Sequence, residues 1–208
     1  RVASALGLYI EELEGARLDT DRLTIEGAEM PLSEAMVEQC GACTQHTPSL
    51  YDVLIGEPGG APRAEPEGAA DPYATVHAME ALSADERWAR FTAEVSRCNL
   101  CYACRNACPL CYCTVCFADR TAPKWANPSA AEEDKQFFQV MRVFHLAGRC
   151  VGCGACSRAC PQGVNLRLFL DKLRLDAEEL FDHQAGVDPE GHPPLRAYRP
   201  DDYNGFVM

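Results

Sequence analysis

One stretch of the chain is crowded with side chains that bind metals. Residues 97–117 read RCNLCYACRNACPLCYCTVCF and hold seven cysteines, from Cys98 to Cys116. All thirteen cysteines of the 208-residue chain fall into three groups, at 40–43, 98–116 and 150–160. A disulfide framework usually spreads an even number of cysteines, whereas thiolates two or three residues apart converge readily on one metal centre. The pattern therefore predicts metal–thiolate chemistry rather than disulfide bonds.

One cysteine spacing occurs twice. The run Cys98-x2-Cys101-x2-Cys104-x3-Cys108-Pro109 is repeated as Cys150-x2-Cys153-x2-Cys156-x3-Cys160-Pro161. The first three cysteines of such a run can wrap one cubane cluster, while the fourth, followed by proline, turns away and can ligate the other cluster. Zinc, the alternative, does not need this run. Two copies predict two [4Fe-4S] clusters in one folding unit.

This arrangement resembles that of two-cluster bacterial ferredoxins. The resemblance implies the following ligands: Cys98, Cys101, Cys104 and Cys160 for cluster one, and Cys150, Cys153, Cys156 and Cys108 for cluster two. The sequence CPLCYC resembles the CP-x-C-x-C element of iron–sulfur subunits in anaerobic hydrogenases, anaerobic sulfite reductases and formate dehydrogenases. The sequence FHLAGRCVGCGACSRACPQGVNLRLFLDKL is similar to heterodisulfide reductase-associated dicluster subunits. These resemblances cover about 83–181, roughly half of the chain.

Five cysteines remain outside the two runs: Cys40, Cys43, Cys111, Cys113 and Cys116. Four of them form two closely spaced pairs, CGAC at 40–43 and CTVC at 113–116. Together these two pairs can form one four-thiolate site. Either a third [4Fe-4S] cluster or a zinc ion could fill it. A third cluster is favoured because it would extend an electron path beside the other two. Cys111 is then the spare cysteine, or an alternative ligand.

Helical segments deliver the chain into and out of the cysteine runs. Residues 81–97 predict an amphipathic helix with Ser83 as N-cap. Its apolar face is expected to carry Trp88, Phe91 and Val95, at steps of three and four residues. A second helix is predicted over 130–149 with an apolar side made of Phe137, Val140, Met141 and Phe144. A third helix is predicted over 164–181.

The predicted fold class is α+β and loop-rich, a two-cluster ferredoxin-like domain enlarged by flanking helices. An N-terminal segment with the CxxC pair is expected over 1–56, helical in 3–18 and turn-like in 26–35. A linker rich in Pro, Gly and Ala follows at 57–72. The dicluster domain is expected over 73–181, and an extended C-terminal tail over 182–208.

Side chains around the first run suggest how its cluster is tuned. Arg105 would favour the more negative reduced state, which predicts a higher potential for cluster one. Gly152 and Gly154 of the second run would let the backbone approach the sulfides and donate N–H bonds.

The function predicted from the sequence is electron transfer. A formal net charge of −12 argues against nucleic-acid binding. The sequence contains no run of eighteen apolar residues, so it predicts no membrane span. There is no G-x-G-x-x-G for a dinucleotide and no C-x-x-C-H for haem. The chain is thus expected to be a non-catalytic, cytoplasmic iron–sulfur subunit that relays single electrons in an anaerobic oxidoreductase complex.

The expected partners are other subunits of that complex, of hydrogenase, formate dehydrogenase, flavin or heterodisulfide reductase type. The main alternative is an iron–sulfur enzyme whose own catalytic cluster lies at the extra cysteine site. A structural scaffold that holds zinc and iron–sulfur centres is a further alternative. Since the sequence begins at Arg1, it does not establish the true N-terminus.

Overall fold

A computed structural model describes residues 17–19, 22–25, 27–37, 52–53, 71–188 and 190–194. Cys40, Cys43, most of the predicted linker and the tail from 195 onward lie outside the described residues. The chain divides into two compact units, Arg1–Asp71 and Pro72–Met208. The units are described separately below.

The first unit contains a small antiparallel sheet in the order β1 (Arg17–Leu18), β2 (Arg22–Ile25) and β3 (Ala28–Pro31), followed by the short helix α2 (Leu32–Ala35). Gly27 makes the β2–β3 turn at φ +85°, a conformation that favours glycine. The helix predicted for 3–18 is therefore wrong at its described end, and 26–35 holds a strand and a helix besides a turn. Strands of two to four residues are too short to show an alternating pattern.

The second unit is helical in its described residues. Its elements are α4 (Ala74–Glu80), α5 (Ala84–Ser96), α6 (Ala103–Asn106), the 3-10 turn η2 (Phe117–Asp119), α7 (Glu132–Phe144), α8 (Ala155–Arg158) and α9 (Leu166–Phe181). The three helices predicted from the sequence are confirmed as α5, α7 and α9. Helices and a small sheet together agree with the α+β class. Because residues 71–188 and 190–194 include no strand, the ferredoxin-like domain stays a prediction.

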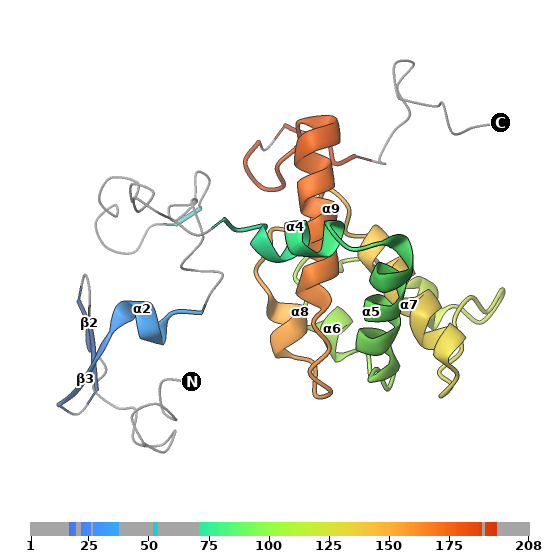
Figure 1. The fold of residues 1–208 in the computed structure, drawn as a ribbon, viewed down its shortest axis with the longest axis horizontal. Coiled ribbons are helices and arrows are strands. Elements are labelled where there is room, and N and C mark those ends of the chain that lie inside the picture. The colour runs from blue at the N-terminus through green and yellow to red at the C-terminus, as the bar shows by residue number, and fades with distance from the viewer. Residues whose placement is uncertain are drawn as a thin grey trace. The chain divides into compact units, whose positions relative to one another are not determined.

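Contacts among the helices bring the two cysteine runs together. In Figure 1, α5 and α7 lie side by side, and α4 crosses α9. The short helices α6 and α8, which belong to the first and second cysteine runs, contact each other, and α8 also contacts α9. The two short helices thus pack against each other, and the long helix α9 packs against α8.

The N-terminus of α5 confirms Ser83 as the N-cap. Glu86 N donates to Ser83 Oγ at 3.3 Å, and Ser83 N donates to Glu86 Oε2 at 2.8 Å. This reciprocal pair is a capping box, which satisfies two backbone donors that helix geometry leaves free. Further along, Val95 is fully buried, but Trp88 is largely exposed and stacks on Phe91. The predicted apolar face is therefore buried only toward its C-terminal end.

Removing this cap should weaken the second unit measurably. We expect Ser83→Ala to lower the free energy of unfolding by about 1 kcal/mol, because the amides at the start of α5 lose their side-chain acceptor. Urea denaturation followed by circular dichroism would measure the change. An unfolding midpoint equal to that of the unchanged chain would contradict the expectation.

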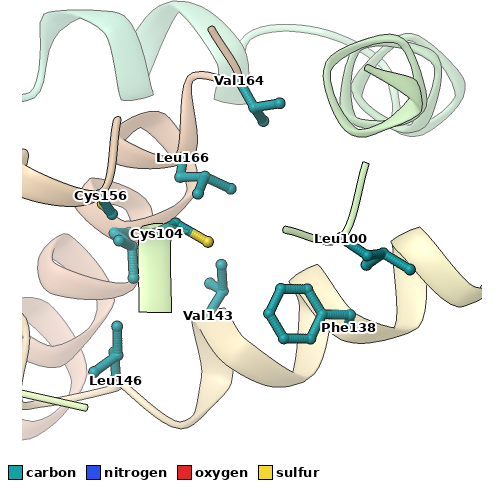
Figure 2. Close-up of a cluster of buried hydrophobic side chains, with 9 residues drawn as sticks. Leu100, Cys104, Phe138, Val143, Leu146, Cys156, Val164 and Leu166 are labelled. Atoms are coloured by element: carbon teal, nitrogen blue, oxygen red, sulfur yellow. The ribbon is translucent and has the colours of Figure 1, made fainter. Parts of the chain in front are cut away.

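The main core packs α7 and the start of α9 around both cysteine runs. Its buried members are Leu100, Cys104, Phe138, Val143, Leu146, Cys156, Val164, Leu166 and Leu170. Figure 2 shows the sulfur-bearing side chains of Cys104 and Cys156 lying among these leucines and valines. The inner cysteine of each run is thus part of the apolar core itself. A second, smaller core joins α4 to α9 through Tyr73, Val76, Leu168 and Leu175.

The buried face of α7 differs from the predicted one. Phe137 and Phe144 are 39% and 53% exposed, and Val140 and Met141 are half-buried. The residues that α7 buries are Phe138, Gln139, Arg142 and Val143. The predicted face was more apolar, but the interior it would fill also contains thiols and loop carbonyls. Gln139 and Arg142 supply donors to those groups, and this explains why a partly polar face turns inward.

The described part of the tail packs against the loop before the second cysteine run. Nε2 of His183 lies 2.8 Å from the carbonyl oxygen of Gly148, which has φ +64°. A Cβ at Gly148 would meet Pro194 Cδ at 2.2 Å, so the tail passes directly over this glycine. Where the structure describes them, residues 182–194 are therefore held against the rest of the second unit.

Candidate metal centre

The two cysteine runs adopt the same local backbone conformation. In the first, Leu100 and Tyr102 have φ of 54° and 60°, and α6 follows. In the second, Gly152 and Gly154 have φ of 68° and 69°, and α8 follows. Each run therefore makes two left-handed turns before a four-residue helix. This repetition gives a structural basis to the internal repeat seen in the sequence.

Backbone amides point at the cysteine sulfurs in both loops. Leu100 N donates to Cys98 Sγ at 3.4 Å, and Gly152 N donates to Cys150 Sγ at 3.4 Å. Val164 N makes a similar bond to Cys160 Sγ, also at 3.4 Å. Such donors stabilise negative charge on sulfur and are a main means by which proteins tune iron–sulfur centres.

The residues that occupy the left-handed positions are not interchangeable. A Cβ on Gly152 would lie 2.3 Å from Arg174 Nη1, so the arginine side chain fills the space that a larger residue would need. Leu100, at the matching position of the first loop, instead buries its side chain in the core. The second loop is thus packed by Arg174, and the first by its own leucine.

Burial of the cysteines follows the repeat as well. Cys104 and Cys156, the third cysteines of the two runs, are buried, whereas the second cysteines, Cys101 and Cys153, are exposed. The remaining cysteines of the two runs, Cys98, Cys108, Cys150 and Cys160, are half-buried. Each loop therefore has one sulfur in the core and one at the surface.

Cysteines from both runs meet at one cavity. It is lined by Cys108 of the first run and by Cys150, Cys153 and Cys156 of the second, the four residues predicted as ligands of cluster two. For the predicted cluster-one set, Cys104 is buried in the main core, Cys98 and Cys160 pack against it, and Cys101 is exposed on the same loop.

The donor set fits a group larger than one ion. Among the described residues, no three His, Cys, Asp or Glu side chains are close enough to hold a single metal ion. A zinc ion would draw its sulfurs to about 2.3 Å from one point. The space between the four thiols is small, about 20 Å³, but four thiols with amides directed at sulfur have the donor chemistry of an iron–sulfur cluster.

The thiols differ in their acidity. Burial raises the pKa of Cys104, and it raises the pKa of Cys150 to about 11. A hydrogen bond from the neighbouring Cys111 thiol, with backbone bonds and the Arg142 charge, outweighs burial and lowers the pKa of Cys108 to about 6. The same hydrogen bond raises the pKa of Cys111. Cys108 is therefore the sulfur of this pair that ionises first.

Arg105 and Arg142 both contact the first cysteine run or its flank, and they differ in how far their charge is compensated. Arg105, which we expected to raise the potential of cluster one, forms an ion pair with Asp119, with Nη1 2.8 Å from each carboxylate oxygen. Asp119 therefore offsets much of its charge. Arg142 is only 2% exposed, and its Nη2 donates to the Cys104 carbonyl at 2.9 Å.

Arg142 and Gln139 were not identified from the sequence. Gln139 Nε2 donates to Cys98 Sγ at 3.2 Å. Burial tends to lower the pKa of Arg142, but the thiols of Cys104 and Cys156 and others nearby raise it. The signal that could have found this pair is their spacing on α7 next to Phe138, on the face opposite the more obvious apolar one.

Three of the cysteines outside the two runs line another cavity. Cys111, Cys113 and Cys116 all face this space of about 350 Å³, together with Arg105, Arg142, His145 and Arg149. The sequence had set Cys111 apart from the predicted third site. The structure instead places it on the same cavity as the other two cysteines. Cys40 and Cys43 lie outside the described residues.

Comparisons with known proteins point to the same part of the chain. Residues 94–164 match the family described as the 4Fe-4S dicluster domain. The F420-dependent formate dehydrogenase subunit beta of Methanocaldococcus jannaschii is 29% identical over 119 residues, 57% of this chain and 30% of the relative. The F420-dependent formate dehydrogenase 1 subunit beta of Methanococcus maripaludis is 30% identical over 110 residues, 53% of this chain and 27% of the relative.

These findings confirm the resemblance to dicluster iron–sulfur subunits that the cysteine spacings indicated. The chain carries a segment of 4Fe-4S dicluster type and is similar to subunits of formate dehydrogenases. They also support the predicted class of function, since both relatives are named as subunits of formate dehydrogenases. The match spans less than a third of each relative's length. In the part of the chain that the structure describes, no helix has the length and apolar character needed to cross a bilayer.

Proposed function

We propose that this chain relays single electrons through two [4Fe-4S] clusters held by the duplicated cysteine runs. The observation that carries the proposal is the cavity shared by Cys108 and the second run, Cys150, Cys153 and Cys156. One cysteine comes from the first motif and three from the second. This is the arrangement expected if the fourth cysteine of each run crosses to the other cluster.

The proposed ligands are those predicted from the sequence. Cys98, Cys101, Cys104 and Cys160 would hold cluster one, and Cys108, Cys150, Cys153 and Cys156 cluster two. A [4Fe-4S] cluster bound there would supply one-electron redox chemistry. The residues of the chain keep both sites in fixed positions, since the inner cysteines are anchored in the core and each loop directs an amide at a sulfur.

The exposed cysteines give each site a surface through which electrons can pass to and from partners. Cys101 and Cys153 are exposed while the other cysteines of the two runs are buried or half-buried. A partner's redox centre can approach each site through its exposed cysteine. This suits a relay between proteins.

The partner that the comparisons support is a formate dehydrogenase-type catalytic subunit. Both relatives are named as beta subunits of F420-dependent formate dehydrogenases, so each belongs to an enzyme with further subunits. By similarity, this chain would act as the iron–sulfur subunit of such a complex. A cytoplasmic location and the anaerobic setting are parts of the same proposal.

Iron analysis and electron paramagnetic resonance test the proposal directly. The full chain, prepared without oxygen, is expected to contain at least about eight iron atoms. Reduction should give signals of two magnetically interacting clusters. An iron-free preparation, or eight cysteines of the two runs found in disulfides, would contradict the proposal.

The partner is tested by isolating the tagged chain from its own cells under anaerobic conditions. A catalytic subunit of formate dehydrogenase type should copurify with it, and formate should reduce the clusters in that complex. If the iron is present but formate leaves the clusters oxidised, the electron-transfer role stands and the choice of partner fails.

A further inference from the structure

The cavity beside η2 has the composition of a third cofactor site. It has room for a small ligand, about 350 Å³, and three cysteines of one short loop line it, Cys111, Cys113 and Cys116. Apolar walls come from Leu110, Phe117, Phe138 and Leu146. The rest of the lining is polar or charged, from Arg105, Asn106, Asp119, Arg142, His145 and Arg149.

A buried cation that lacks part of its hydrogen bonding faces the same cavity. Arg142 lines it, is 98% buried, and keeps Nε and Nη1 without a hydrogen-bond partner among the described residues. A buried guanidinium with two unmade bonds is costly unless an anion accepts them. Arg149, which lies over the Tyr112 ring, lines this cavity too. The cavity is therefore built for a negatively charged group.

The spread of the three thiols indicates how large the group is that they could bind. In the described residues, no three metal-binding side chains converge on one ion, so a single zinc ion does not match these three sulfurs. A thiolate-bound [4Fe-4S] cluster is larger and anionic, and it accepts N–H bonds on its sulfides. Such a cluster would fill the cavity, bind the three thiols and accept the hydrogen bonds that Arg142 leaves unmade.

We infer that Cys111, Cys113 and Cys116 supply three ligands of a third [4Fe-4S] cluster, and that Arg142 is its buried counter-charge. This deepens the proposed function, on which it rests, and it changes the sequence-based ligand set, in which Cys111 was spare. Cys111 N donates to the carbonyl oxygen of Cys108 at 3.2 Å, and Cys108 lines the cavity of cluster two. The third site therefore adjoins cluster two.

Substitution of Cys111 distinguishes this ligand set from the sequence-based one. The full chain, reconstituted anaerobically with iron and sulfide, should bind about twelve iron atoms, and Cys111→Ser should bind about eight. Cys113→Ser and Cys116→Ser should show the same loss. Thr114→Ala, an exposed residue of the same loop without sulfur, should keep the full iron content.

Three outcomes would overturn the inference. The first is that Cys111→Ser keeps the iron of the unchanged chain. The second is that the unchanged chain binds only about eight iron atoms, in which case the two-cluster function stands alone. The third is a zinc ion that disappears with Cys111→Ser. An unchanged chain without iron would instead mean that the proposed function itself has failed.

The role assigned to Arg142 has its own test. Arg142→Met should keep the folded state, by circular dichroism, and shift the reduction potential of the signal lost in Cys111→Ser to a more negative value. Arg142→Lys should restore most of that shift, and the exposed Arg120→Met should cause none. A potential that is unchanged in Arg142→Met would show that the arginine is structural and not a counter-charge.

Discussion

Replacing Cys156 should remove one whole cluster permanently, whereas the cluster lost by replacing Cys153 should return when a small thiol is added. We expect Cys156→Gly to bind about four fewer iron atoms than the unchanged chain. Cys156 is 5% exposed and lies in the apolar core, so neither water nor an added thiol can reach the vacated ligand position. Anaerobic iron analysis and the spectrum of the reduced protein would measure the loss.

Cys153 is the matched control, because it belongs to the same loop and cavity but is exposed. In Cys153→Gly a small thiol from solution can occupy the ligand position, so added 2-mercaptoethanol should restore the iron content. The same addition should leave Cys156→Gly deficient. Equal rescue of both variants would show that burial does not control access to this site.

The largest loss of stability from an apolar substitution is expected at Phe138. Its side chain is 1% exposed and packs against Tyr102 and Phe117, with ring centroids 4.9 Å and 5.9 Å away. Truncation to alanine should lower the free energy of unfolding by about 3–5 kcal/mol, since it removes apolar contacts and leaves a cavity. Urea denaturation at equal iron content would measure this difference.

The neighbouring Phe137 provides the control for Phe138. It has the same chemistry and lies on the same helix but is 39% exposed. Phe137→Ala should change the free energy of unfolding by no more than about 1 kcal/mol. If the two variants lose the same stability, the buried face of α7 is not the one described here.

The sequence was most informative where chemistry and periodicity are local. The cysteine spacings predicted the repeated loops, since wrapping a cluster depends on a few consecutive residues. Ser83 predicted the start of α5, because capping involves only the first turn of a helix. The extent of α9 and the start of α7 followed from helical periodicity, whereas α7 ends at Phe144 and not at residue 149 as predicted.

Tertiary packing decided the features that the sequence did not predict. Helix α7 offers two possible inward faces, and the more apolar one, with Phe137 and Phe144, is the one left outside. Arg142 could not be identified from the sequence because its partner, the Cys104 carbonyl, lies 38 residues away. Cys111 seemed spare because the cavity it shares with Cys113 is enclosed by α7, which no local spacing reveals.

The place of Cys108 beside Cys150, Cys153 and Cys156 makes the two loops of the repeat depend on each other. A chain with only one of the loops would have three converging sulfurs and a fourth turned away from them. Such a half-length protein could complete its coordination only by associating with a second, identical molecule.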